Sequence, residues 1–219
     1  METFAQSFER LPQIRAGIGL YQEPNHGLYD VYDHTMQVFE EARKIDRSLG
    51  FGIAALLHDI GKPDTARPMV NGAVHELNPL GKSYNTFKKH EEVGQGIVER
   101  LNPRLFTADN LDQNLIATLV GSHGLPHEQI KELRYFSNIQ HWPWFLEQYQ
   151  TMTRLIKSRG IDPKQILDLF LADKRGGGNS FPDQEEVELL ISTILKSNHP
   201  TTSEIRRIYD LQRGLTRDS

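Results

Sequence analysis

The stretch 54–62, AALLHDIGK, decides how this chain is interpreted. It is an apolar run of the kind that a folded protein buries, and it ends in His58 and Asp59. Burying an unpaired carboxylate costs several kcal/mol, and burying an unpaired imidazole is also costly. A metal ion removes both costs, because imidazole nitrogen and carboxylate oxygen are ligands of divalent metals. The pair therefore predicts a metal site if other His and Asp residues converge on it.

Four other segments carry a polar residue on an apolar helical face. They are YDHTMQVFEEA with His34, FKKHEEVGQGIVERL with His90, IATLVGSHGL with His123 and LDLFLADKRG with Asp173. In the first segment, His34 shares a face with Val38 and other apolar residues at offsets of three and four. Such offsets turn each polar residue toward the core of the protein. Five inward-facing segments with His or Asp are more than ordinary core packing explains, so we expect these residues to meet.

These strings resemble those of a known family. HDIGK and LADKRG, with the order of the histidines and acids along the chain, are similar to the HD-domain metal-dependent phosphohydrolases. FKKHEEVG resembles the corresponding stretch of the HD domain in bacterial CCA-adding tRNA nucleotidyltransferases. The resemblance covers roughly residues 28–176. It implies a helical bundle and a divalent metal ion held by His34, His58, Asp59 and Asp173.

The resemblance leaves the number of ions open. Two-metal members of the family add histidines at the places of His90 and His123, and the Asp of the His-Asp pair bridges the two ions. Such members often carry an adjacent histidine pair late in the motif, whereas here Gly124 follows His123. With one ion, the same histidines contact the phosphate or donate a proton. We expect one or two ions of Mn, Fe, Ni, Co, Zn or Mg.

The implied chemistry is hydrolysis of a phosphate ester by a metal-activated water molecule. The residues expected to carry catalysis are Asp59, Lys62, His90 and His123. Lys62, Lys89 and Arg175 are expected to bind substrate phosphate, since a cation neutralises developing charge and guanidinium binds phosphate through two hydrogen bonds. Lysine at a helix end also complements the helix dipole, and surface lysines are commonly just solvated, so these structural interpretations stay open.

The pattern of the chain predicts a mostly α-helical HD-domain bundle with a loop and short β-hairpin excursion around residues 63–89. Asn71 and Gly72, between short apolar runs, favour the hairpin, and His75 and Asn85 are expected to be exposed there as specificity residues. The helices are expected at 2–15, around His34, and at 51–60, 90–101, 111–122, 128–138, 142–159, 163–174, 183–197 and 202–214.

We expect one domain over residues 1–219, with a motif core at about 28–176 and C-terminal helices at 183–214 packed on it. The chain is 37% hydrophobic and 25% charged, which is typical of globular proteins. Its net charge of −4 gives no general attraction for nucleic acid or acidic membranes. The absence of cysteine excludes disulfides and thiolate metal sites. Without an apolar leader or spanning run, a cytoplasmic location is expected and no membrane partner.

We predict a metal-dependent phosphohydrolase acting on a small-molecule nucleotide or a nucleic-acid end, as a monoesterase or a diesterase. The sequence has no nucleophile elbow, no Gly-rich phosphate loop and no HExxH pair, which argues against three other enzyme classes. Two alternatives remain: a non-catalytic HD module that binds metal or nucleotide and regulates a partner, and a di-iron HD-type oxygenase. The oligomeric state is not fixed by the sequence.

Overall fold

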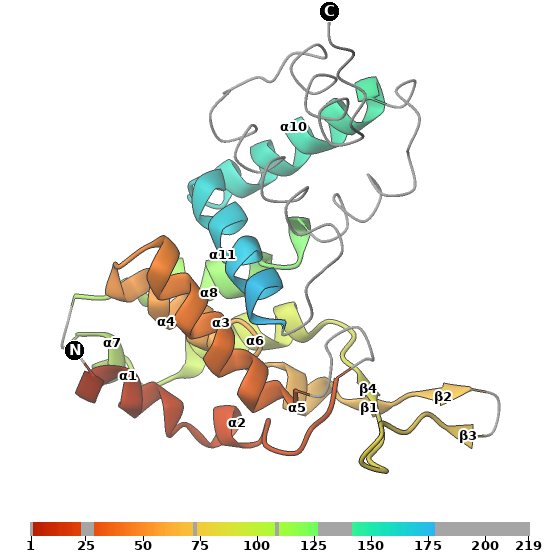
Figure 1. Cartoon of the computed structure of the whole chain (residues 1–219). Helices are drawn as coiled ribbons and strands as arrows, with labels where there is room; N and C mark the ends of the chain where they lie inside the picture. The colour runs from red at the N-terminus through yellow and green to blue at the C-terminus, as the bar shows by residue number, and fades with distance from the viewer. Residues whose placement is uncertain (1, 23–28, 72–73, 108–109, 127–141, 178–219) are drawn as a thin grey trace, which may run out of the picture.

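A computed structural model describes residues 2–22, 29–71, 74–107, 110–126 and 142–177 of the chain. Helices make up most of this part, as the sequence predicts, and short strands are confined to one excursion (Figure 1). None of the helices searched in this part is both long enough and apolar enough to cross a membrane. The fold is therefore a helical bundle, and its site is assembled from several helix ends.

The centre of the bundle is α4, Leu49–Leu57. Every residue from Phe51 to Leu57 is buried, so this helix has no solvent face and must be covered on all sides. The cover comes from four neighbouring helices: α1 (Glu2–Glu9), α3 (Val31–Ile45), α8 (Gln113–Ser122) and α11 (Pro163–Gly176). His58 follows directly in helical conformation, and the chain then passes through Gly61 into the short helix α5, Lys62–Thr65. The His-Asp pair is thus carried into the interior by the most apolar helix of the described chain.

Helices α3, Val31–Ile45, and α11, Pro163–Gly176, lie side by side on this centre. They run in opposite directions, as the contact between His34 near the start of α3 and Gly176 at the end of α11 shows. Asp30 caps α3 by accepting a hydrogen bond from the Asp33 amide at 2.8 Å, and Asp162 caps α11. A side chain at Gly176 would lie 2.6 Å from the backbone nitrogen of Val38, so glycine permits this close approach.

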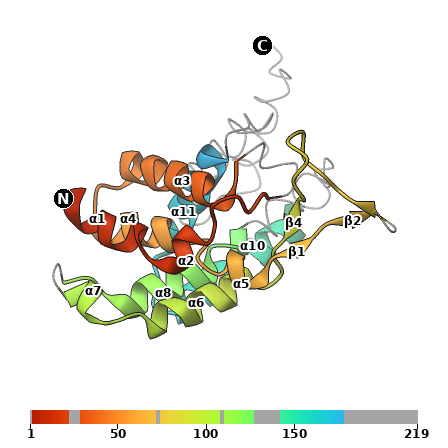
Figure 2. The same ribbon diagram turned by 90° about the horizontal axis from the view of Figure 1, so that it is seen from below.

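The other side of the site is built by α6, His90–Arg100, and α8, Gln113–Ser122, which pack together (Figure 2). The link between α4 and α5 lies directly on α6. A Cβ atom at Gly61 would come within 2.1 Å of the His90 carbonyl oxygen. Glycine at this position therefore sets how closely the His-Asp pair approaches the helix that begins at His90.

Two small antiparallel sheets form the excursion between α5 and α6 (Figure 1). β2, Val70–Asn71, pairs with β3, Val74–His75, which confirms the predicted hairpin. β1, Arg67–Pro68, pairs with β4, Asn85–Thr86. The expectation that Asn85 is exposed was wrong: it is buried, and its backbone and side-chain nitrogens both donate to the Tyr21 carbonyl. It anchors the excursion to the body instead of facing solvent.

Most predicted helices are present with shifted ends. The predicted helix 2–15 is two helices, α1 at Glu2–Glu9 and α2 at Pro12–Arg15, because Pro12 cannot continue α1 and begins α2 instead. The short helix α7, Arg104–Thr107, was not predicted. The helix α10, Trp142–Ser158, has its predicted extent to within one residue. The predicted helices 128–138, 183–197 and 202–214 lie outside the described residues.

We predict that Gly176→Ala destabilises the protein, because the new methyl group must displace the backbone of Val38. The expected loss is about 1–3 kcal/mol of unfolding free energy, which is typical of overpacking. Gly50→Ala is the matched control, since its Cβ would meet only the Leu111 side chain, at 3.8 Å. Alanine inside a helix raises the free energy of unfolding by about 0.5–1 kcal/mol relative to glycine, so this variant should be at least as stable as the wild type. Thermal and urea unfolding measure both variants, and equal stability of the two would contradict this account of the packing.

Candidate metal centre

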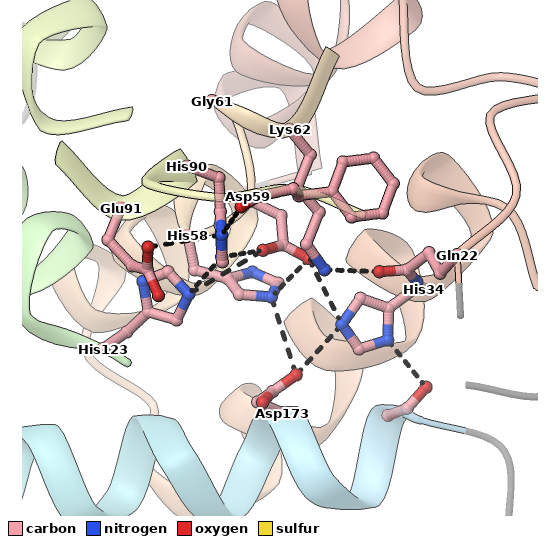
Figure 3. A network of polar contacts seen from close by, with 12 residues as sticks. Gln22, His34, His58, Asp59, Gly61, Lys62, His90, Glu91, His123 and Asp173 are labelled. Atoms are coloured by element: carbon pink, nitrogen blue, oxygen red, sulfur yellow. Dashed lines mark hydrogen bonds and ion pairs between the residues drawn. The ribbon is translucent and has the colours of Figure 1, made fainter. Parts of the chain in front are cut away.

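Six His and Asp side chains that are far apart in the sequence meet in one cluster (Figure 3). They come from five segments: the first turn of α3, the end of α4, the start of α6, the end of α8 and the last turn of α11. All except the half-buried His90 are buried. The members are His34, His58, Asp59, His90, His123 and Asp173. The structure thus brings together all the residues that the sequence nominated as metal ligands.

Asp59 is the centre of the cluster. Its Oδ2 lies 3.1 Å from His58 Nε2 and 3.4 Å from His34 Nε2. Its Oδ1 lies 3.3 Å from His90 Nε2 and 3.7 Å from His123 Nε2. Each carboxylate oxygen therefore faces one pair of histidines. The potential ligand atoms form two groups, His34–His58–Asp59 and Asp59–His90–His123, and Asp59 belongs to both.

Asp173 closes the first of these groups from α11. Its Oδ1 lies 3.0 Å from His34 Nε2 and 3.8 Å from His58 Nε2. The histidines of the first group thus have a carboxylate oxygen on two sides. An ion bound between them would have two imidazole and two carboxylate ligands, which is a donor set suited to borderline and hard divalent metals.

The four imidazoles are all fixed in the same way, through a backbone carbonyl at Nδ1. His58 Nδ1 lies 2.7 Å from the Ala55 oxygen, His90 Nδ1 2.8 Å from that of Phe87 and His123 Nδ1 2.6 Å from that of Val120. His34 Nδ1 faces the Gly176 oxygen at 3.4 Å. A carbonyl only accepts, so Nδ1 carries the proton and Nε2 of each neutral ring presents a lone pair.

This arrangement fits a metal ion and does not suit the cluster without one. The Nε2 lone pairs face carboxylate oxygens, and those of His90 and His123 face each other at 3.3 Å. Each such contact brings two hydrogen-bond acceptors together, which is repulsive. A cation between them turns every such contact into an attraction. Without a cation, relief requires extra protons on buried rings. The residues present therefore fit a bound divalent metal.

The pKa values of the cluster side chains are shifted in different directions. Burial alone raises the pKa of Asp59, but His58 and Lys62 outweigh it and hold that pKa well below the ordinary value. Burial, with His90 and His58 beside it, holds the pKa of His123 well below its usual range, so its ring is neutral. Burial lowers the pKa of His34 too. For His58, the neighbouring Asp59 outweighs burial and raises the pKa. Asp59 is thus a carboxylate ready to bind a cation.

The family model of the HD domain matches residues 31–159, which is more than half of the chain. The chain belongs to the HD domain family. The A-adding tRNA nucleotidyltransferase of Deinococcus radiodurans is 32% identical over 130 residues, which are 57% of this chain and 27% of that protein. The chain thus spans about a quarter of that curated relative's length. No solved structure matches this chain. HD domains bind divalent metals, in agreement with the His and Asp cluster.

Beside the cluster of this HD domain lies the buried ammonium group of Lys62. Its Nζ is 2.6 Å from Asp59 Oδ2, donates to Gln22 Oε1, and lies 5.4 Å from the centre of the Phe87 ring. The sequence predicted Lys62 at the end of a helix, where its charge would complement the helix dipole. The structure instead places it at the first residue of α5, where its charge faces Asp59. The ammonium group of Lys62 therefore compensates the negative charge of the Asp59 carboxylate.

Of the two other predicted phosphate-binding residues, Lys89 lies apart from the cluster. Lys89 is exposed, and its Nζ is 3.9 Å from Glu92 Oε2, so the described structure does not bring it to Asp59. Its backbone is left-handed, with φ of 65°, immediately before His90. Arg175 is half-buried near the end of α11, two residues after Asp173. It is the neighbouring Lys174 whose Nζ contacts Asp173, at 3.6 Å.

Sequence reasoning missed two side chains at the edge of the cluster. Gln22 is buried against Lys62, and Glu91 Oε2 lies 3.3 Å from His90 Nδ1 (Figure 3). Glu91 directly follows a proposed ligand in the string KKHEE, and that adjacency was a usable signal. Gln22 stands outside any helical pattern and twelve residues before His34, so nothing in its local sequence pointed to the site.

We predict that Mn²⁺ raises the melting temperature of the wild-type protein, and that Asp59→Asn and His58→Ala abolish this shift. Binding to the folded state at a hundred times the dissociation constant contributes about 2.7 kcal/mol. His90→Ala and His123→Ala are expected to retain part of the shift, because the group with His34 and Asp173 stays intact. Differential scanning fluorimetry and metal analysis of dialysed protein measure both effects.

Asp64→Asn is the matched control for this measurement, because Asp64 is exposed on α5 only five residues beyond Asp59. It should behave as the wild type does. An Mn²⁺ shift that survives in Asp59→Asn and in His58→Ala would refute the assignment of these side chains as ligands.

Proposed function

We propose that this HD domain is a metal-dependent phosphohydrolase that cleaves a phosphate ester of a nucleotide or of a nucleic-acid end. The family, which is mostly metal-dependent hydrolases, supports the reaction class. The substrate class is supported by the curated relative, whose name specifies tRNA. The observation that carries the proposal is the convergence of four histidine Nε2 atoms on the buried Asp59 carboxylate.

In this proposal His34, His58, Asp59 and Asp173 hold one divalent ion. A second ion would use Asp59 again, with His90 and His123. A bound divalent cation lowers the pKa of a water molecule and polarises a phosphoryl oxygen, the two effects that ester hydrolysis requires. The backbone carbonyls at Nδ1 keep the four rings in the productive tautomer and orientation throughout.

The remaining residues act on the substrate. Lys62 supplies a positive charge 2.6 Å from Asp59 and is proposed to neutralise charge on the phosphoryl group. His90 is the most exposed of the four rings, which suits it to meet the substrate and move a proton. Arg175 is proposed to bind an outer phosphate oxygen from the end of α11, and Lys89 to attract the anion from the surface beside His90.

We predict that the protein hydrolyses phosphate esters only with added divalent metal, and that Asp59→Ala abolishes turnover. His90→Ala and His123→Ala are each expected to lower kcat by about 10²-fold or more, the usual contribution of a proton-transfer group. The measurement is a screen of p-nitrophenyl phosphate, bis-p-nitrophenyl phosphate, nucleotides, 2′,3′-cyclic nucleotides and short oligonucleotides with Mn²⁺, Ni²⁺, Co²⁺, Mg²⁺ and Zn²⁺.

The alternatives give different results in the same screen. A regulatory HD module binds metal or nucleotide without turnover of any ester, and its nucleotide affinity would be lost in Asp59→Ala. A di-iron oxygenase requires iron and consumes oxygen. Turnover that needs neither added metal nor Asp59, with Asp64→Ala as the control for the substitution itself, would overturn the proposal.

A further inference from the structure

Residues 19–22, which are not helical, are held in place from two directions. The Gly19 amide donates to the Asp30 carboxylate at 2.6 Å, and Tyr21 forms a β-bridge with Asp30. On the other side, the Tyr21 carbonyl accepts from the backbone nitrogen and from Nδ2 of Asn85, at 3.1 and 2.9 Å. This double clamp fixes the backbone next to Gln22, so the position of that side chain is built into the fold.

The clamp delivers the Gln22 amide to the edge of the metal centre (Figure 3). The side-chain oxygen of Gln22 accepts from Lys62 Nζ, and the same Nζ contacts Asp59 Oδ2. An ammonium group has donors only, so chemistry decides the orientation of the amide: Oε1 faces Lys62 and Nε2 is the other terminal atom. Gln22 therefore offers two N–H donors beside the site.

These donors are buried and have no hydrogen-bond partner among the residues that the structure describes. Only 1% of the Gln22 surface is exposed. Buried amide groups in native proteins are almost always satisfied, so an unsatisfied one calls for a ligand or a solvent molecule. The Lys62 ammonium group lies next to this amide and offers a positive charge together with further N–H donors, a combination that suits an oxyanion.

We propose that Gln22 binds a phosphoryl oxygen of the substrate through Nε2, while its Oε1 keeps Lys62 against Asp59. Lys62 uses two contacts, on Asp59 and Gln22, and its third N–H is available for the same phosphoryl group. Gln22 and Asp59 contact the same Lys62 ammonium group, so a phosphoryl group that reaches Asp59 and Lys62 lies next to Gln22 as well. The inference rests on the proposed function, because it assigns a contact to that same substrate.

Gln22→Glu separates binding of phosphate from positioning of Lys62. A carboxylate still accepts from Lys62, but it replaces the amide donors with a negative charge that repels phosphate. We expect Gln22→Glu to weaken binding of inorganic phosphate to the Mn²⁺-loaded protein by about tenfold or more, the value of a hydrogen bond to a charged group. KM for the phosphate ester should rise correspondingly, while the Mn²⁺-induced stabilisation stays.

Two further variants make the result unambiguous. Gln22→Met removes the donors without adding charge and should weaken phosphate binding as well, so the loss does not depend on repulsion alone. Gln6→Glu adds the same charge at an exposed position of α1 and should bind phosphate as the wild type does. Isothermal titration with inorganic phosphate, and inhibition of turnover by it, are the readouts.

Wild-type phosphate affinity in Gln22→Glu or in Gln22→Met would overturn the inference, and so would a wild-type protein with no affinity for phosphate. The result is separable from the fate of the proposed function. If the wild type binds phosphate and Gln22→Glu does not, the inference holds even where no ester in the screen is cleaved. If esters are cleaved and the variants match the wild type in phosphate affinity, this inference alone fails.

Discussion

One buried carboxylate, that of Asp59, determines how the rest of this structure is arranged. Both of its oxygens are surrounded by imidazole Nε2 atoms, and the only described cation in direct contact with it is Lys62. A carboxylate in the interior is tolerated when charge or metal compensates it. The helices are therefore organised so that four of them deliver a nitrogen to one point, and the apolar α4 carries the acid itself into the middle.

The precision of the cluster comes from helix ends. Three of its histidines lie at or just beyond the end of a helix or at its first residue, and each uses a carbonyl three residues earlier to fix its ring. The Ala55 and Phe87 carbonyls also accept a hydrogen bond from the backbone amide of the same histidine, at 3.4 and 3.3 Å, so the ring and the backbone of His58 and of His90 are fixed to one oxygen each. Gly61 and Gly176 then allow the ends to approach closely. The packing of the helices and the orientation of the candidate ligands thus depend on the same few backbone atoms.

Sequence reasoning recovered the family, the helical class and the residues of the cluster, because their signals are local: HDIGK after an apolar run, and single polar residues on apolar helical faces. It failed where the deciding interaction is remote. The local sequence predicts that Asn85 is an exposed loop residue, yet it is buried and donates a hydrogen bond to the Tyr21 carbonyl. Gln22 carries no pattern, and only the close approach of α5 gives it a role. Lys89 lies beside the proposed ligand His90 in sequence, but its side chain is exposed to solvent near Glu92.

These failures share a cause that bears on substrate choice. The proposed metal ligands lie on helices or directly at their ends, where the periodicity of the helix indicates which face points inward, so the sequence alone identifies them. The excursion between α5 and α6 is joined to the site through Asn85, Tyr21 and Gln22, which lie on irregular backbone and are connected by hydrogen bonds that no periodicity encodes. Lys62 lies where the two parts meet, since it contacts Asp59 on one side and Gln22 on the other. Under the proposed function, a change in the excursion therefore reaches the ammonium group that meets the phosphate without moving any proposed metal ligand, and so alters substrate choice while the metal site stays the same.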